Sequence, residues 1–225
     1  MSVRFDRVGL VRGDQVVLDE VSLDLAEHRV GLIGANGSGK STLVRMINGL
    51  VRPTTGSVLV HGVDVGKHSG RVRSKVGFLF SDAEHQIVMP TVREDLEFSL
   101  RRRVRSRTER ADLVTRAMAQ FGLTEMADRP CHALSGGEKQ LLALAAVLLA
   151  EPDVVVADEP TTLLDRLNAR LIASRLAGLR QQVLLVTHHL DLLTDFDRVI
   201  VLHQGRVVAD DVPARAIEHY TNLVG

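Results

Sequence analysis

The 225-residue sequence has few aromatic side chains, which limits the ligands that it can bind by stacking. It contains six Phe, a single tyrosine (Tyr220) and no Trp. Proteins that hold single-stranded nucleic acid stack successive bases on aromatic rings, and such rings are scarce here. The 28 Lys and Arg residues balance 28 Asp and Glu residues, so no net positive charge attracts nucleic acid either. We therefore expect no nucleic-acid partner.

The sequence also lacks the features of secreted and membrane-spanning proteins. Its one cysteine, Cys131, cannot form an internal disulfide, which fits a reducing compartment, and we interpret it as structural. The longest apolar run, LLALAAVLLA at residues 141–150, is shorter than the about 20 residues of a bilayer span and predicts a buried helix. The N-terminal MSVRFDRVGL has no long apolar segment typical of a secretion signal. A cytoplasmic protein is expected.

Short apolar segments alternate with helix-like segments along the chain. The patterns predict strands at residues 3–11, 16–25, 29–34, 57–62 and 76–80, and helices at residues 91–104 and 108–123. Another helix-like segment begins at Lys40 and stops near Gly49. Strands return at residues 153–158 and 182–189, followed by a hairpin about Gln204 and Gly205 and a C-terminal helix. This order predicts an α/β protein whose parallel sheet is covered on both faces.

We expect one domain over residues 1–225. Residues 1–81 and 151–225 would form a catalytic core and a β subdomain, and residues 82–150 a helical subdomain. The basic run RRRVRSR at residues 101–107 lies in this helical part. We interpret it as a solvated helix end and loop, with a contact to lipid headgroups or a partner as the alternative.

A glycine-rich segment, GANGSGKST, follows the apolar RVGLIG and precedes a predicted helix. Its spacing is that of the phosphate-binding loop G-x-x-x-x-G-K-[ST]. The glycines let backbone N–H groups turn toward phosphate oxygens, and the helix N-terminus adds a positive dipole. We expect Lys40 to contact the β and γ phosphates and Ser41 to contact Mg²⁺. The predicted nucleotide-binding residues are Gly34, Ala35, Asn36, Gly37, Ser38, Gly39, Lys40, Ser41 and Thr42.

The apolar segment DVVVADEP ends in two adjacent acids, Asp158 and Glu159. In an extended chain they point to opposite sides, so one can face a metal while the other faces water. We assign Asp158 to Mg²⁺, directly or through water, and Glu159 to polarising the water that attacks the γ-phosphate. Without a phosphate loop in the same chain, a pair of solvated acids would be the better interpretation.

A second arrangement suited to phosphate is LSGGEKQ at residues 134–140. It offers the Ser135 hydroxyl, two glycines for close approach, and the N-terminus of an apolar helix. One chain therefore carries two anion sites, whereas a simple kinase or GTPase needs one.

With these motifs, nearly the whole sequence resembles the ATP-binding-cassette (ABC) ATPases. The family's segments appear in order: Walker A GANGSGKST, signature LSGGEKQ, Walker B VVVADEP, D-loop TTLLD, and VTHH with the switch histidine. The resemblance implies an ABC-type P-loop domain with a RecA-like parallel sheet core, an antiparallel β subdomain and a helical subdomain. It also implies a head-to-tail dimer in which ATP lies between the P-loop of one subunit and the signature of the other.

The resemblance also implies roles for single residues. His188 would contact the γ-phosphate and position the attacking water, whereas the adjacent His189 would not be catalytic. Asp165 would belong to the D-loop and shape the dimer interface. The signature residues that would act across the dimer are Ser135, Gly136, Gly137 and Glu138.

The sequence departs from the family's pattern at two places. The glutamine usual after VGFLF, which touches Mg²⁺, is replaced by Ser81, and Gln86 follows five residues later. We leave the Mg²⁺ contact open between the two, with a plain loop glutamine as the alternative for Gln86. The aromatic ring that usually stacks on adenine near the first strand is missing. Arg12 could stack its guanidinium there or be a solvated turn residue, and Tyr220 stands at the wrong end of the sequence.

The segments FSDAEHQIVMPTVREDLEFSL, DEPTTLLD and VTHHLDLL resemble the energy-coupling-factor (ECF) importers, most of all the ATPase subunit of biotin transporters. This implies ATP with Mg²⁺, a homodimer or a heterodimer with a related cassette, and two integral membrane partners, one coupling and one substrate-binding. It also implies a peripheral position on the cytoplasmic face of the membrane. The alternatives are a cobalt or nickel ECF importer, a cassette for export or lipoprotein release, and a soluble assembly factor.

Overall fold

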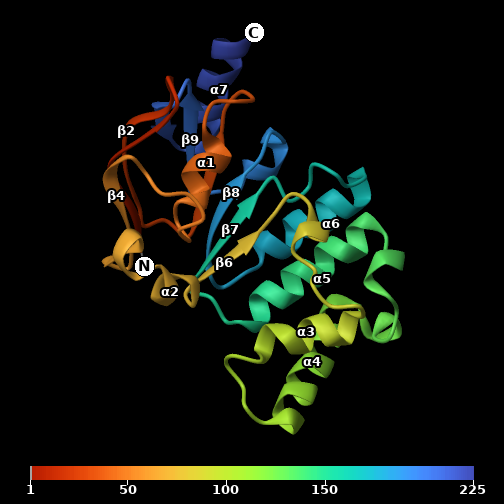
Figure 1. Ribbon diagram of the computed structural model, residues 1–225. Helices are drawn as coiled ribbons and strands as arrows, with labels where there is room; N and C mark the ends of the chain where they lie inside the picture. Colours follow the sequence, from red (N-terminus) through yellow and green to blue (C-terminus); the bar gives the residue numbers. More distant parts are fainter. Residues whose placement is uncertain (1) are drawn as a thin grey trace.

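The structure is a computed structural model that describes residues 2–225. Within these residues the strands form two sheets that share one hydrophobic core (Figure 1). The smaller sheet is antiparallel, in the order β2-β1-β4-β5. Its strands are β1 (Val3–Arg12), β2 (Gln15–Leu25), β4 (Thr55–Val60) and β5 (Val63–Asp64).

The larger sheet has the order β10-β9-β3-β8-β7-β6. Its strands are β3 (Arg29–Ile33), β6 (Val76–Leu79), β7 (Val154–Asp158), β8 (Gln182–Val186), β9 (Arg198–His203) and β10 (Arg206–Asp211). Neighbours pair in parallel except β9 and β10, which form the predicted hairpin. Its turn lies at Gln204 and Gly205, whose φ angles of 46° and 78° are typical of a type I′ turn.

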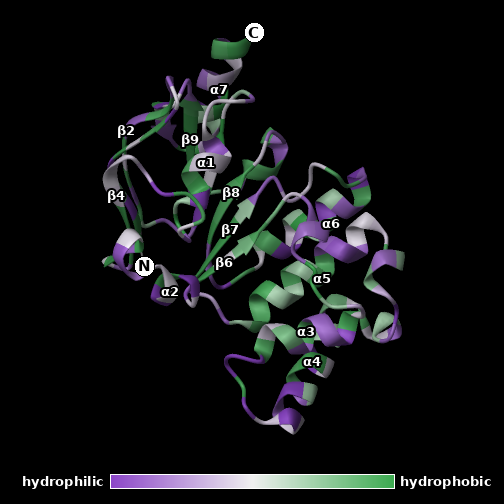
Figure 2. Ribbon diagram, viewed as in Figure 1, coloured by the Kyte–Doolittle hydropathy of each residue, from purple (hydrophilic) through white to green (hydrophobic). Residues whose placement is uncertain are grey.

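The inner strands of this sheet are apolar on both faces because both faces are covered. In β7, Val154 and Val156 belong to the core shared with the smaller sheet, whereas Val155 and Ala157 belong to the core beneath the helices. Alternate side chains of a strand point to opposite faces, so each face needs its own apolar set. Figure 2 shows these strands in green at the centre of the molecule. The predicted sheet, covered on both faces, is confirmed.

Helices lie over both faces of the larger sheet. On the face of the smaller sheet, α1 (Lys40–Arg45) and α2 (Val65–Arg73) contribute to the shared core. The remaining helices pack on the opposite face: α3 (Val92–Leu100), α4 (Arg107–Phe121), α5 (Gly136–Leu149), α6 (Arg166–Ala177) and α7 (Pro213–Val224). Figure 1 places α3 and α4 at the end of the molecule away from β2 and β4, and α7 at the C-terminus.

Local signals explain where several helices begin and end. Thr91 caps α3 through a capping box with Glu94, and the helix starts where the sequence predicts it. Helical hydrogen bonding in α1 ends at Arg45, and turns continue to Gly49. There Leu50 N donates to Arg45 O at 3.0 Å and Gly49 has a φ of 71°, which closes the segment as a Schellman motif does.

The sequence analysis missed α2 and the two-residue β5. The α2 segment VGKHSGRVR contains two glycines, which disfavour a helix, and its regular geometry is interrupted at His68. It forms because Asp64 caps its N-terminus and because Val65 and Val72 are buried in the core. In the described part of the chain, no helix combines the length and the apolar character that crossing a bilayer requires.

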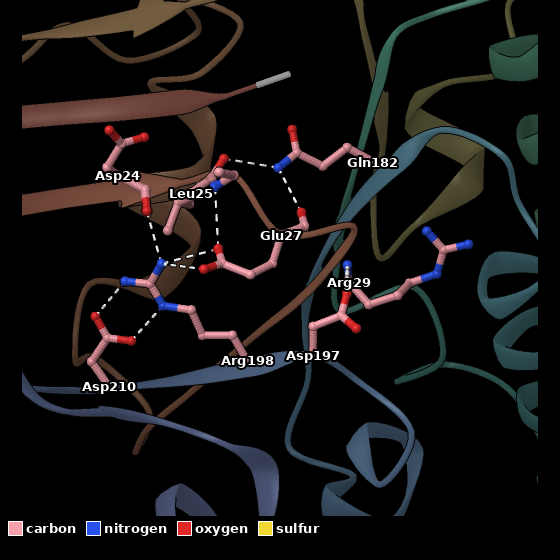
Figure 3. Close-up of polar contacts among 9 residues, drawn as sticks. Asp24, Leu25, Glu27, Arg29, Gln182, Asp197, Arg198 and Asp210 are labelled. Carbon is pink, nitrogen blue, oxygen red and sulfur yellow. Dashed lines mark hydrogen bonds and ion pairs between the residues drawn. The ribbon is translucent and has the colours of Figure 1, made fainter.

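Two arginines hold the amino edge of the larger sheet, where β3, β8 and β9 begin (Figure 3). The buried Arg29 guanidinium donates to the backbone oxygens of Ala177, Leu179, Gln181 and His28. Arg198 pairs with Asp210 and Glu27 and also donates to Asp24 O. These contacts fasten the strand starts at the edge opposite the nucleotide loop.

Candidate nucleotide site

Four of the predicted site segments lie at the carboxyl edge of the larger sheet. The glycine loop follows β3, Ser81 follows β6, Glu159 follows β7 and His188 follows β8. Ligands of parallel α/β sheets bind at this edge because the loops after the strands meet there. A cleft of about 900 Å³ opens at this place. Its lining residues are Arg12, Gln15, Val17, Gly34, Ala35, Asn36, Gly37, Gly39, Lys40, Ser41, Thr42, Ser81, Glu159, Thr162, His188, Tyr220 and Val224.

The loop between β3 and α1 has the backbone that its glycines permit. Gly34 has a φ of 151°, and a Cβ at this position would lie 2.1 Å from Leu202 O. Lys40 is buried and donates from Nζ to Gly34 O at 2.8 Å and to Ala35 O at 3.0 Å. Burial lowers the pKa of Lys40, while the charges of Glu159 and Asp158 raise it. The ammonium therefore lies inside the loop that would surround a phosphate.

Asp158 is buried at the end of β7 and bound by two side chains of α1. Ser41 Oγ donates to Asp158 Oδ1 at 2.7 Å, and Arg45 Nε donates to Asp158 Oδ2 at 3.1 Å. Ser41 and Arg45 are four residues apart and hence on one face of the helix. Sequence reasoning missed Arg45, although this spacing from Ser41 was a signal that could have found it.

Glu159 and His188 contact each other at the carboxyl ends of β7 and β8. His188 Nδ1 lies 2.7 Å from Glu159 Oε2, and Thr162 Oγ1 donates to the same oxygen at 2.9 Å. Glu159 has a φ of 54°, a strained conformation for a residue other than glycine. This conformation turns the chain directly after Asp158. Thr162 was missed by sequence reasoning, and its motif position gave no signal of this contact.

The donor set at the loop fits Mg²⁺. The Ser41 hydroxyl and an Asp158 carboxylate oxygen are adjacent, and hard oxygen donors are what Mg²⁺ prefers. Among residues 2–225 there is no group of three or more His, Cys, Asp or Glu that could hold a metal. Mg²⁺ usually takes one or two protein ligands together with waters and substrate phosphates.

The signature residues lie outside this cleft, at the N-terminus of α5. Ser135 caps the helix, and its backbone N–H donates to Glu138 Oε2 at 2.6 Å in a capping box. That hydrogen bond is the main cause of the lowered pKa of Glu138. Asp165 likewise caps α6. None of Ser135, Gly136, Gly137 and Asp165 lines the cleft of its own chain.

The two residues left open for the Mg²⁺ contact lie in different surroundings. Ser81 lines the cleft beside the glycine loop. Gln86 does not, and its side chain is bonded to the end of β6: Nε2 donates to Phe78 O at 3.2 Å, and Oε1 accepts from Phe80 N at 3.3 Å. The geometry favours Ser81, and the choice between the two stays a prediction.

The structure corrects the interpretation of Tyr220. Its position near the end of the sequence was taken to exclude it, yet Tyr220 and Val224 of α7 line the same cleft as Arg12. The reason is that α7 packs against β9 and β10, beside the strand that carries the glycine loop. Arg12 is the last residue of β1 and is exposed. The single tyrosine is thus available to a nucleotide in this cleft.

Comparison with known proteins agrees with this geometry. The family model for the ABC transporter matches residues 18–162, which hold the glycine loop, the signature and the Asp158–Glu159 strand. The chain belongs to the ABC transporter family. It is an ATPase of the ECF importer group, in which ATP hydrolysis is coupled to transport.

Three relatives illustrate the group. The biotin transport ATP-binding protein BioM of Rhizobium etli is 42% identical over 99% of both chains. The cobalt import ATP-binding protein CbiO of Syntrophus aciditrophicus is 39% identical over 89% of this chain and 74% of its own. The ECF transporter ATP-binding protein EcfA1 of Bacillus licheniformis is 36% identical over 94% of this chain and 77% of its own.

Solved structures confirm the fold of this ABC ATPase. The cbiO1 protein of Clostridium perfringens, part of the CbiONQ transporter complex, superposes with a TM-score of 0.84 at 27% identity, covering 99% of this chain and 94% of that one. The cassette MJ0796, solved as a dimer with ADP and Pi, gives a TM-score of 0.83 at 27% identity over 94% of this chain and 98% of that one.

Proposed function

We propose that this ATPase subunit powers the uptake of biotin. The similarity to BioM over 99% of both chains supports biotin, because the cobalt relative is less similar and extends beyond the matched region. Import of cobalt is the second candidate, and that relative is the observation in its favour. The transported compound would bind a membrane partner, so we assign no residue of this chain to it.

We propose that Glu159 is the general base and that His188 positions the attacking water. The contact of 2.7 Å between His188 Nδ1 and Glu159 Oε2, at the cleft of the glycine loop, carries this proposal. A carboxylate that accepts hydrogen bonds from His188 and Thr162 is held in one orientation and can take a proton from water. Its strained backbone is a further sign of a functional position.

The glycine loop would bind the triphosphate through its backbone N–H groups and Lys40. Lys40 now donates to the oxygens of Gly34 and Ala35, and it would exchange these contacts for the β and γ phosphates. Ser41 and Asp158, with Ser81 or Gln86, would hold Mg²⁺, which would offset the charge of the phosphates. Arg12 would stack on the base from the end of β1.

Catalysis would require two subunits arranged head to tail. Ser135, Gly136, Gly137 and Glu138 lie outside the cleft of their own chain, which supports their use on ATP held by a partner. A γ-phosphate shared by two surfaces would join them, and its removal would release them. Asp165 would lie at this interface. The partner is a second copy of this chain or a related cassette.

The membrane partner would dock in a second groove, of about 390 Å³, beside α5. The groove includes Ile87, Val88, Met89 and Pro90, and Val88 is 62% exposed. Exposed apolar side chains of this kind are typical of protein interfaces. An integral coupling protein in this groove would hold the ATPase on the cytoplasmic face of the membrane, together with a substrate-binding membrane protein.

The test is purification of the tagged chain from its native membranes in mild detergent, followed by mass analysis of its partners and bound small molecules. Two integral membrane proteins and retained biotin are the expected result. The same kind of complex with cobalt or nickel would favour the second candidate. Recovery of the chain without membrane partners would contradict the proposal.

A further inference from the structure

The D-loop acid and the signature helix of one chain meet at a single side chain, that of Asn168. Asn168 lies in the first turn of α6, three residues after the capping residue Asp165. Its backbone N–H donates to Asp165 Oδ1 at 2.9 Å, and its side-chain Nδ2 donates to Asp165 Oδ2 at 2.7 Å. Both carboxylate oxygens are therefore bound by one residue, which fixes the plane of the carboxylate and of the amide.

The other side of the Asn168 amide lies against Gly137 of the signature. A Cβ placed on Gly137 would lie 2.4 Å from both Cγ and Oδ1 of Asn168, and 2.8 Å from its Nδ2. These distances are far shorter than van der Waals contact, so the amide packs directly on the main chain of α5. The neighbouring Gly136 is different, because its Cβ would meet nothing closer than Leu164 Cδ2 at 3.6 Å.

The two glycines of the signature therefore differ in the space around them within their own chain. A methyl group on Gly137 would have to displace the Asn168 amide, whereas Gly136 has room for a methyl group. Asn168 does not line the nucleotide cleft, so it would act on the reaction only through the groups that it holds. It is half-buried between them.

We propose that Asn168 is a positioning residue that sets the signature motif relative to Asp165 of the same chain. The inference rests on the proposed head-to-tail dimer, in which both groups face the partner subunit. With Asn168 in place, the distance between the Ser135–Gly137 turn and the D-loop is fixed when the two face the partner. Without it, each keeps its own helix cap but the spacing between them is no longer fixed.

The functional test uses Asn168→Ala in a Glu159→Gln background, where ATP would be bound but not hydrolysed. ATP affinity of the isolated monomer should stay unchanged, because Asn168 lies outside the cleft. ATP-induced dimerisation, followed by analytical ultracentrifugation, should weaken about tenfold, as expected for loss of a coupling contact. Arg170→Ala, an exposed substitution on the same helix, is the matched control and should dimerise normally. Unchanged dimerisation of Asn168→Ala would overturn the proposal.

A folding test is independent of the dimer. Gly137→Ala should lower the melting temperature of the monomer, because the new methyl meets the Asn168 amide. In the Asn168→Ala background the same substitution should lower it much less, while Gly136→Ala should leave it unchanged or raise it. An equal loss from Gly137→Ala in both backgrounds would show that the contact does not constrain Gly137 and would sink the inference.

The dimerisation test separates the role of Asn168 from the proposed function. If Glu159→Gln does not dimerise with ATP at all, the proposed head-to-tail mechanism fails whatever Asn168 does. If Glu159→Gln dimerises and Asn168→Ala in that background dimerises equally well, the proposed function stands and the positioning role is wrong.

Discussion

At the scale of single residues, the proposed mechanism depends on how Glu159 is held. Glu159→Gln keeps the shape of the side chain but cannot accept a proton from water. We expect ATP binding and ATP-induced dimerisation to persist and turnover to fall by about 10²–10⁴, the usual contribution of a general base. Phosphate release and sedimentation in the presence of ATP measure both. Normal turnover, or the absence of an ATP-induced dimer, would contradict the assignment.

The adenine end of the cleft allows a second prediction. Arg12 and Tyr220 line the cleft from opposite ends of the sequence. Arg12→Ala should weaken ATP binding and reduce the preference for ATP over GTP, because loss of a stacked cation costs about 0.5–2 kcal/mol. Tyr220→Ala tests in the same assays whether the other candidate side chain in the cleft stacks on the base. If Arg12→Ala leaves both quantities unchanged, Arg12 is a solvated turn residue, and an effect of Tyr220→Ala alone would assign the stacking to α7.

Asp95, a buried carboxylate of α3, yields a prediction about pH. Burial raises its pKa, although the backbone N–H groups of Val88 and Met89 donate to it. Both donate to the same oxygen, Oδ1, at 2.9 and 3.0 Å, so an asparagine could accept both without a charge. A raised pKa means that the folded state binds the proton more tightly, so the wild type loses stability as pH rises through the pKa of Asp95.

Asp95→Asn should therefore be at least as stable as the wild type at pH 7, and its advantage should shrink toward pH 4. Asp95→Ala, which leaves two N–H groups without their acceptor, should lose about 1–3 kcal/mol. Urea unfolding at several pH values measures these differences. If Asp95→Asn is less stable than the wild type at neutral pH, the two N–H groups of Val88 and Met89 require a charged acceptor.

Among single residues, the sequence predicted those whose type and spacing are dictated by phosphate chemistry. Lys40 and Ser41 follow the glycines of one loop at fixed offsets, and Asp158 ends an apolar strand. The structure brings Asp158 against Ser41. Tyr220 and Thr162 could not be found in this way. Tyr220 reaches the cleft only through the packing of α7, which no local pattern specifies.

At the scale of elements, periodicity predicted the helices in which capping residues and buried apolar residues favour the same structure. The helix α3 combines a capping box at Thr91 with buried Val92, Leu96 and Leu100, so its pattern was readable. The helix α2 was not, since its glycines oppose a helix and tertiary burial overrides them. Local propensity decides an element only where packing does not decide otherwise.

The amino edge of the larger sheet gives a prediction at this scale. Arg29 joins the start of β3 to the end of α6 and to the start of β8 through backbone oxygens (Figure 3 labels Arg29 and its neighbour Asp197). Lysine has three donors on one nitrogen and cannot reach these oxygens together. Arg29→Lys should cost about 1–3 kcal/mol in urea unfolding, because buried carbonyl groups lose their donor.

Arg206→Lys is the control for Arg29→Lys. Its side chain is 71% exposed and pairs with Asp19 at the surface, so the substitution should change the stability by less than about 1 kcal/mol. If the two substitutions cost the same, the buried contacts of Arg29 do not hold the sheet edge together.

At the scale of the whole molecule, the glycine loop lies inside the cleft and the signature, the second element predicted to bind phosphate, lies outside it. The glycine loop ends β3 at the carboxyl edge, whereas the signature begins α5 on the helical face. The motifs alone indicated both elements, and only the family resemblance implied their separation, because separation depends on how the elements pack. This separation is what makes a second subunit necessary in the proposed mechanism.

Mixing two inactive variants tests this arrangement directly. Lys40→Ala removes the cation of the glycine loop, and Gly136→Asp places a carboxylate where the partner's γ-phosphate would lie. Gly136 has room for a Cβ within its own chain, and an acid in the first turn suits α5, so the fold should be preserved. Each variant alone should be inactive, since every site in its homodimer lacks one component.

In a mixed dimer, the glycine loop of the Gly136→Asp chain meets the signature of the Lys40→Ala chain, and that site is intact. Random pairing should therefore restore about a quarter of the wild-type sites in an equimolar mixture, which ATPase assays would detect. If each chain used its own signature, no combination would be intact and the mixture would stay inactive. Recovered turnover thus requires the head-to-tail arrangement, and its absence with both variants folded and mixed dimers formed would exclude it.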